Sequence, residues 1–273
     1  MTWELPGPAW LFCPADRPER YAKAAERSDV VIIDLEDAVA PADKPAAREA
    51  LIATPLDPER TVVRVNPVGT ADHEADLEAL RRTSYTRVML PKCESGDEVR
   101  SLAPLEVVAL IESPLGVLAV EDIAVAENTL GMMWGAEDLV AGLGGNASRH
   151  ADGTYRAVAQ HARSVTLLAA KGHARWALDS VYLNIKDTDG LYEEALDAVA
   201  VGFDIKVSIH PSQVDVVRRA YAPTPEEEAW ARRVLEAAES ERGVFDFEGK
   251  MVDAPVLRHA ERVLQRASVA ASA

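Results

Sequence analysis

Two acidic side chains, Glu112 and Asp138, stand just after apolar runs of the sequence and could carry chemistry. Glu112 ends the segment VVALIE, and Asp138 follows the segment LGMMWGAE. Their separation of 26 residues is close to the ~30 residues of one strand–helix–strand unit. Such a unit would place both carboxylates at the same end of neighbouring parallel strands, roughly 5 Å apart. Two carboxylates at that separation suit a magnesium ion, although each acid could instead cap a helix.

Other charged residues also lie within or just after apolar runs. Arg64 lies inside the segment TVVRVN, where a charged side chain is costly to bury unless it is paired. Its guanidinium could hold a substrate carboxylate through two hydrogen bonds or stabilise a developing oxyanion. The acids of DLED (residues 34–37) could reach a metal, hold basic side chains or begin a helix. Lys92 and His210 follow later runs and also fit ordinary loop residues.

Several other chemistries lack the residues that they require. The sequence contains no GxSxG, no Walker phosphate loop and no GxGxxG fingerprint. Its two cysteines, Cys13 and Cys93, have neither a pairing pattern nor metal-ligand spacing, so no disulfide framework or zinc site is expected. The formal net charge of −16 argues against general nucleic-acid binding. An anionic small substrate would therefore need a local cluster of basic side chains.

The elements that must position these residues follow from an alternation of apolar runs and helical segments, which indicates a parallel sheet. Eight strand–helix units are predicted, the number found in a (β/α)8 TIM barrel. An open, doubly wound sheet is the alternative, but it normally has fewer strands and a nucleotide fingerprint. The predicted strands are residues 9–13, 30–34, 61–65, 87–90, 107–111, 130–134, 177–183 and 204–209. The predicted helices are residues 18–27, 44–53, 71–82, 97–103, 115–126, 155–173, 189–201 and 213–220.

We expect residues 1–222 to form the barrel and residues 223–273 to form a C-terminal helical extension. The extension should contain a charged helix over 226–242, an irregular segment and a last helix over 254–267. Such a tail would pack on a neighbouring subunit or close over the site. Within the barrel, the glycine-rich stretch 142–154 is expected to form a mobile rim rather than a phosphate cradle.

The sequence also indicates the cellular compartment in which the protein is expected. Its first ten residues lack the basic and apolar regions of a signal peptide, and no apolar run approaches the ~20 residues that cross a bilayer. Unpaired cysteines are typical of a reducing compartment. We therefore expect a cytoplasmic protein without membrane partners.

Eight fragments of the sequence, in order, resemble the citrate lyase β-subunit-like branch of the HpcH/HpaI aldolase superfamily. The resemblance extends from Leu11 to about Ala260 and includes Lys44 and Arg48 after the second fragment. The fragments are LFCPADRPERYAKA, VVIIDLEDAV, VVRVN, VMLPK, LIESPLG, WGAEDL, IHPSQ and EGKMVDAP.

This resemblance implies a magnesium ion held by Glu112 and Asp138, with a keto acid such as oxaloacetate or pyruvate completing its shell. It implies that Arg64 contacts the substrate and that the backbone amides of Gly135 and Ala136 hold a bound carboxylate. Glu137 then becomes a structural acid.

The resemblance also implies a coenzyme A thioester as substrate, with Arg17, Arg20 and Lys23 as its phosphate-binding cluster. It implies a homotrimer in which Asp253 reaches a neighbouring active site as acid/base. Asp37 is the other candidate for taking the hydroxyl proton.

The predicted function is a magnesium-dependent lyase that cleaves a carbon–carbon bond of a citramalyl-CoA, malyl-CoA or 3-hydroxy-3-methylglutaryl-CoA type of substrate. The products would be acetyl-CoA and a keto acid. One alternative is a citrate lyase β subunit, which cleaves a citryl thioester on an acyl carrier protein and needs partner subunits. Another is a barrel that binds a metabolite without catalysis.

Overall fold

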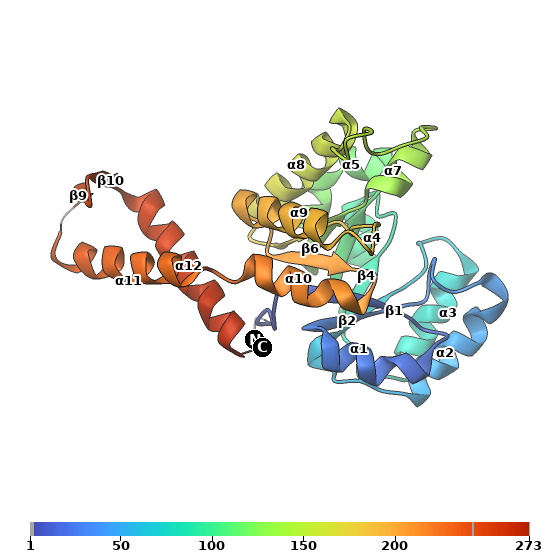
Figure 1. The fold of residues 1–273 in the computed structure, drawn as a ribbon. Helices are drawn as coiled ribbons and strands as arrows, with labels where there is room; N and C mark the ends of the chain where they lie inside the picture. Colours follow the sequence, from blue (N-terminus) through green and yellow to red (C-terminus); the bar gives the residue numbers. More distant parts are fainter. Residues whose placement is uncertain (1–2, 242, 273) are drawn as a thin grey trace.

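The computed structural model describes residues 3–241 and 243–272 and confirms a closed, eight-stranded parallel barrel with helices around it (Figure 1). The strands pair in chain order, and β1 also pairs with β8, which closes the sheet. The strands are β1 (Ala9–Pro14), β2 (Val30–Asp34), β3 (Thr61–Arg64), β4 (Arg87–Leu90), β5 (Glu106–Ile111), β6 (Thr129–Trp134), β7 (Trp176–Asp179) and β8 (Ile205–Ser208).

The helices around the barrel follow the predicted segments closely. They are α1 (Tyr21–Arg27), α2 (Lys44–Ala53), α3 (Ala71–Leu80), α4 (Gly96–Ser101), α5 (Pro114–Leu118), α6 (Val120–Val125), α7 (Ala136–Gly142), α8 (Ala157–Gly172), α9 (Thr188–Val201) and α10 (Pro211–Tyr221). Short 3-10 turns over Pro18–Arg20, Pro41–Asp43 and Pro58–Arg60 each carry proline in the first turn, where its missing N–H leaves no donor unpaired.

The alternation of side chains along the strands creates two apolar layers. One set, which includes Trp10, Ile32, Met89 and Leu178, fills the barrel, and the other packs between the strands and the helices. Because both faces of each strand are buried, the strands read as continuous apolar runs in the sequence. This is why their positions could be predicted to within a few residues.

Two segments differ from the prediction. The single helix expected over 115–126 is two helices, α5 and α6, which meet at Ala119 with φ −103° and ψ 9°. The Asp122 carboxylate accepts the Gly96 N–H at 2.6 Å and so ties α6 to the start of α4. The acidic stretch after β6, over which no helix was predicted, forms α7, because Gly135 serves as N-cap and acids occupy the first turn.

The C-terminal extension projects from the barrel as a pair of long helices (Figure 1). They are α11 (Pro225–Ser240) and α12 (Ala254–Ser272), and a hairpin of β9 (Phe245–Phe247) and β10 (Lys250–Val252) joins them. Thr224 and Glu227 form a capping box at the start of α11. The predicted end of this helix, Arg242, lies outside the described residues, and the hairpin was not predicted. The extension has a small core of its own, formed by Ala231, Val234, Val252, Ala260 and Val263.

Among the described residues, no helix is both long enough and apolar enough to cross a bilayer.

Candidate active site

Glu112 is the buried acid of the site. It follows β5 directly, and its side chain is only 4% exposed. Its Oε1 accepts the backbone N–H of Lys92 at 3.1 Å. Burial raises the pKa of Glu112 to about 8, because the loss of hydration outweighs the opposing effect of the Lys92 ammonium. Without a further cation, this carboxylate is therefore poorly stabilised in its charged form.

Gly135 leaves the space that the Glu112 carboxylate occupies. A Cβ atom added at Gly135 would come within 2.8 Å of both Cβ and Oε2 of Glu112. Any other residue would therefore displace the carboxylate. The Gly135 N–H already donates to the Ile111 carbonyl at 2.9 Å. Of the two amides predicted to hold a carboxylate, that of Ala136 lies in the first turn of α7, where helical N–H groups lack intrahelical partners.

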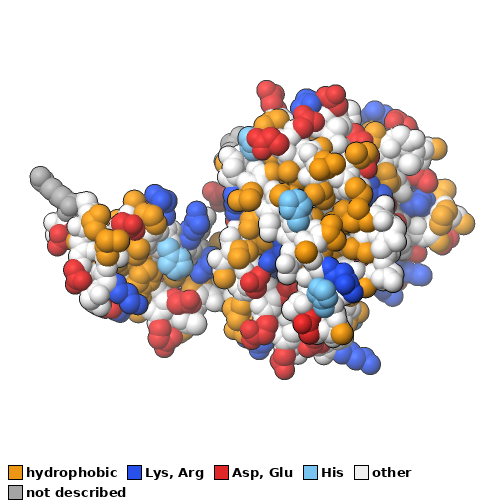
Figure 2. All heavy atoms as spheres, turned by 90° about the horizontal axis from the view of Figure 1, so that it is seen from above, with side chains coloured by type: hydrophobic (Ala, Val, Ile, Leu, Met, Phe, Trp, Pro, Cys, Tyr) orange, Lys and Arg blue, Asp and Glu red, His pale blue; other side chains and the backbone are white. Residues whose placement is uncertain are grey.

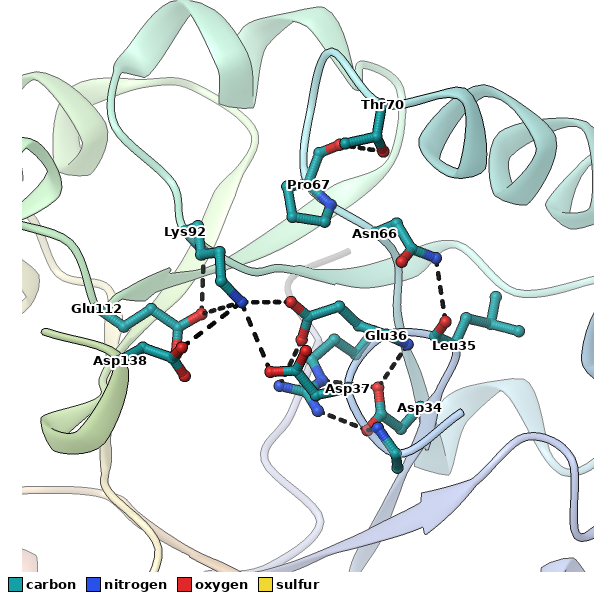
Figure 3. Close-up of polar contacts among 12 residues, drawn as sticks. Asp34, Leu35, Glu36, Asp37, Asn66, Pro67, Thr70, Lys92, Glu112 and Asp138 are labelled. Carbon is teal, nitrogen blue, oxygen red and sulfur yellow. Dashed lines mark hydrogen bonds and ion pairs between the residues drawn. The ribbon is translucent and has the colours of Figure 1, made fainter. Parts of the chain in front are cut away.

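Asp138 faces the same point as Glu112 but comes from a helix. It lies in the first turn of α7, and its side chain is 42% exposed. Its Oδ1 and the Oε1 of Glu112 each lie 3.9 Å from the Lys92 Nζ (Figure 3). Both carboxylates therefore lie next to the Lys92 ammonium, although Asp138 reaches this point from the first turn of α7 and not from the end of a strand.

Lys92 joins these two acids to the acids that follow β2. Its Nζ lies 2.5 Å from Glu36 Oε1 and 3.6 Å from Asp37 Oδ2, on the opposite side from Glu112 (Figure 3). Although partial burial opposes it, the hydrogen bond from Lys92 to Glu36 and the nearby carboxylates raise the pKa of the ammonium. From the sequence alone Lys92 also fits an ordinary loop residue, because its four acidic neighbours come from three separate parts of the chain.

Arg64 is the other basic side chain of the site. It ends β3, and its Nε and Nη2 donate to the two Asp34 oxygens at 2.7 and 2.5 Å. Its Nη1 lies 2.9 Å from Glu36 Oε2, and the guanidinium stacks on the Phe12 ring at 4.7 Å. Burial opposes the charge of Arg64, but Asp34 and Glu36 raise its pKa. Asp34 at the end of β2 and Glu36 just after it therefore hold Arg64 in one orientation, which is one of the roles that the sequence left open for these acids.

A buried polar network fixes the loop that carries Glu36. Lys44 Nζ donates to the carbonyls of Leu35 and Glu36 and to Asn66 Oδ1, all within 2.8 Å. The Asn66 N–H and its side-chain amide in turn donate to Asp76 Oδ2. The other oxygen of Asp76 pairs with Arg48 at 2.7 Å. The sequence points to Lys44 and Arg48 only through a resemblance. It does not point to Asp76, because this residue lies in the middle of a helix.

The predicted phosphate-binding cluster lies at the same end of the barrel. Arg17 follows β1, Arg20 ends the adjoining 3-10 turn, and Lys23 lies in α1. All three side chains are exposed, and the two arginines have only long ion pairs, to Asp16 at 3.7 Å and Glu19 at 3.9 Å. They are therefore available to a ligand in this structure.

Asp253 is the one predicted residue that its own chain does not bring to the site. It precedes α12, where its Oδ1 accepts the Val256 N–H at 3.3 Å. The adjoining hairpin β9–β10 lies at the end of the extension that points away from the barrel (Figure 1).

Two other residues considered from the sequence have local structural partners. Glu137 accepts the Ser148 hydroxyl at 2.6 Å and so ties α7 to the loop that follows it. His210 caps α10, because its side chain accepts the Ser212 N–H at 3.2 Å.

The donor set fits a magnesium ion. Glu112 and Asp138 direct two hard oxygen ligands at a point next to an existing cation, and Gly135 leaves room for one of them. Within the described ranges, no group of three or more His, Cys, Asp or Glu side chains could hold a metal. Magnesium commonly takes only one or two carboxylates and completes its octahedron with water or substrate, whereas zinc and calcium sites use more protein ligands.

Comparisons with known proteins show the family of the chain. Residues 9–211 match the model of the HpcH/HpaI aldolase/citrate lyase family. A citrate lyase subunit beta-like protein of Mycobacterium tuberculosis is 63% identical over 272 residues, which cover 100% of both chains. The human mitochondrial citramalyl-CoA lyase is 30% identical over 301 residues, which cover 97% of this chain and 86% of the relative.

A solved structure is also very similar. It is that of the M. tuberculosis protein CitE in complex with magnesium, acetoacetate and coenzyme A. The TM-score is 0.92 at 64% sequence identity, and the match covers 96% of this chain and 98% of that one.

Proposed function

Since the chain belongs to the HpcH/HpaI aldolase/citrate lyase family, we propose that it is a magnesium-dependent carbon–carbon lyase acting on an acyl-CoA. The substrate is a 3-hydroxyacyl-CoA with a second carboxylate, of the citramalyl-CoA, malyl-CoA or 3-hydroxy-3-methylglutaryl-CoA type. The products are acetyl-CoA and a keto acid. The observation that carries this proposal is the pair Glu112 and Asp138 beside the fixed guanidinium of Arg64.

Glu112 and Asp138 would hold the metal, and the acid end of the substrate would share it. Bound magnesium supplies a Lewis acid that makes the substrate hydroxyl easier to deprotonate. The Ala136 amide at the start of α7 is suited to the substrate carboxylate, because helix N-termini favour anions.

The chain's own residues account for the remaining steps. A base removes the hydroxyl proton, the carbon–carbon bond breaks, and its electron pair passes to the thioester as an enolate. Arg64 stabilises the enolate oxygen, since its guanidinium is already oriented by Asp34 and Glu36. An acid then returns a proton to the enolate carbon, which gives acetyl-CoA.

Asp37 and Asp253 are the candidates for these proton transfers. Asp37 is 60% exposed and 3.6 Å from the Lys92 ammonium, so it can reach a ligand without moving out of a core. Asp253 would have to come from another subunit. A homotrimer in which the extension reaches a neighbour would supply it.

The shape of the chain supports such an assembly. The extension projects from the barrel and buries only a small core of its own (Figure 1). Figure 2 shows hydrophobic side chains at the surface of both the extension and the barrel. Large exposed ones include Val244 and Met251 on the extension and Leu118 and Leu168 on the barrel helices α5 and α8.

The Arg17, Arg20 and Lys23 cluster is the proposed site for the phosphates of coenzyme A. It supplies local positive charge at the mouth of a barrel whose chain carries a formal net charge of −16.

Cys13 and Cys93 are buried free thiols, which supports a reducing, cytoplasmic setting.

The second candidate is a citrate lyase β subunit, since the 63% identical relative is named a citrate lyase subunit beta-like protein. It would act on a citryl thioester of an acyl carrier protein and would be inactive alone on acyl-CoA.

Both functions are tested by incubating the purified chain with citramalyl-CoA, malyl-CoA and 3-hydroxy-3-methylglutaryl-CoA, with magnesium or with a chelator. Magnesium-dependent release of acetyl-CoA from one of them supports the first reading. Cleavage of only the carrier-bound thioester, and only with partner subunits, supports the second.

A further inference from the structure

Lys92 lies at the centre of the charges of the site. Its Nζ is within 4 Å of four carboxylates, two on each side (Figure 3). The whole site contains five carboxylates but only two basic side chains, Arg64 and Lys92. The carboxylates are Asp34, Glu36, Asp37, Glu112 and Asp138.

The backbone of Lys92 is shaped to place it there. Its φ of 51° is in the left-handed region, which residues other than glycine rarely adopt. The same conformation directs the Lys92 N–H to Glu112 Oε1 at 3.1 Å. The backbone N–H and the ammonium of Lys92 therefore both lie close to Glu112, the proposed metal ligand. An ordinary solvated loop lysine would not make both contacts.

We infer that Lys92 is a positioning residue that acts as the built-in counter-charge of the metal site. It reduces the affinity of Glu112 and Asp138 for the divalent cation and increases the affinity of the loaded site for an anionic keto acid. This inference rests on the proposed function, because it assumes that the two acids hold magnesium.

The direction of both effects follows from Coulomb's law. The ammonium lies 3.9 Å from each ligand oxygen, so it must repel a cation bound between them. Its removal leaves the site with five carboxylates against Arg64 alone. We expect Lys92→Met to bind magnesium about tenfold more tightly or better, and to bind oxaloacetate about tenfold more weakly once magnesium is saturating.

The opposite signs distinguish this role from simple support of the fold, since a loosened site would bind both ligands more weakly. Lys92→Met adds no new backbone strain, because both residues have a Cβ at the same positive φ. Lys92→Arg keeps the charge and should bind both ligands nearly as the wild type does. Lys171→Met removes a half-exposed lysine paired with Asp204 on another part of the surface and should change neither affinity.

The test is isothermal titration calorimetry of the full-length chain with magnesium alone, then of the magnesium-saturated chain with oxaloacetate. Tighter magnesium binding together with weaker oxaloacetate binding in Lys92→Met supports the inference. Equal or weaker magnesium binding by a Lys92→Met protein with a wild-type melting temperature overturns it and leaves the proposed function standing. If that variant does not fold, Lys92→Gln is measured instead, and the same changes in magnesium and oxaloacetate affinity are expected. Failure of the wild type to bind magnesium overturns both.

Discussion

Arg64 shows how neighbouring acids turn a buried charge into an oriented one. Three of its donor atoms are engaged by Asp34 and Glu36, and its plane rests on the Phe12 ring. From the sequence, a charged residue inside a strand already required a partner, and the acids after β2 were available to provide it. A role for Lys92 could not be predicted in the same way, because its positive φ and its four acidic neighbours arise only in the folded chain.

Replacing Arg64 should slow turnover. Arg64→Lys loses the two-pronged contact with Asp34 and the fixed donors toward an enolate oxygen, so kcat should fall by ~10²–10³. Magnesium binding should change much less, because Glu112 and Asp138 remain. Steady-state kinetics and calorimetry measure the two effects. Arg81→Lys, at an exposed arginine paired with Glu78, is the matched control and should behave as the wild type.

Glu112 should make the stability of the fold depend on pH. Its folded-state pKa of about 8 is above its ordinary value of 4.5. The folded state therefore holds this proton more tightly than the unfolded state does. The resulting stabilisation is complete below pH 4.5 and is lost as the pH rises through about 8.

Melting temperatures measured with a chelator at pH 6 and pH 9 test this. We expect the wild type to lose more stability over that interval than Glu112→Gln, which cannot titrate at this position. Magnesium should restore the wild type at pH 9, because it binds the charged carboxylate. Parallel losses in the two proteins would mean that Glu112 is already ionised at pH 6.

At the scale of elements, the barrel strands could be predicted because burial on both faces gives each a continuous apolar run. Helix α7 was less accessible, since the glycines after it resemble a loop. Its start is marked by Gly135 and by two acids in the first turn, a signal that the sequence did contain. The β9–β10 hairpin has only three residues in each strand and gave no periodic signal.

The junction of β6 and α7 carries its own prediction. Gly135→Ala adds a Cβ that would lie 2.8 Å from Glu112 Oε2, so the carboxylate must move. We expect magnesium affinity to fall by about tenfold or more, a loss of roughly 1.4 kcal/mol in binding free energy. Calorimetry measures it. Gly172→Ala, at the end of α8 where an added Cβ meets nothing within 4 Å, is the control. Unchanged affinity in Gly135→Ala would show that Glu112 is not a ligand.

A single chain brings together only part of the proposed site. Glu112, Asp138, Arg64 and Asp37 come together at one end of the barrel. Asp253 lies on the extension, which points away (Figure 1). The sequence could suggest that a tail packs on a neighbour or closes over the site. A role for Asp253 in a neighbouring site came only from a resemblance, because neither periodicity nor spacing indicates which surface a tail contacts.

Complementation between variants tests the shared site. Arg64→Ala and Asp253→Ala should each be nearly inactive as pure proteins. Co-expressed and co-purified, they should regain up to about a quarter of wild-type activity, because random closed assembly unites an intact Arg64 with a neighbour's intact Asp253 in that share of sites. No recovery in a verified mixed oligomer would place Asp253 outside the active site.

We propose that Glu112 and Asp138 hold a magnesium ion that the chain uses to break a carbon–carbon bond of an acyl-CoA. The most direct measurement follows acetyl-CoA and pyruvate released from citramalyl-CoA by the wild type and by a Glu112→Gln/Asp138→Asn variant, each with magnesium or a chelator. We predict equal amounts of the two products from the wild type with magnesium only, and none from the variant. Cleavage by the chelated wild type, or by the variant at the wild-type rate, would contradict the claim.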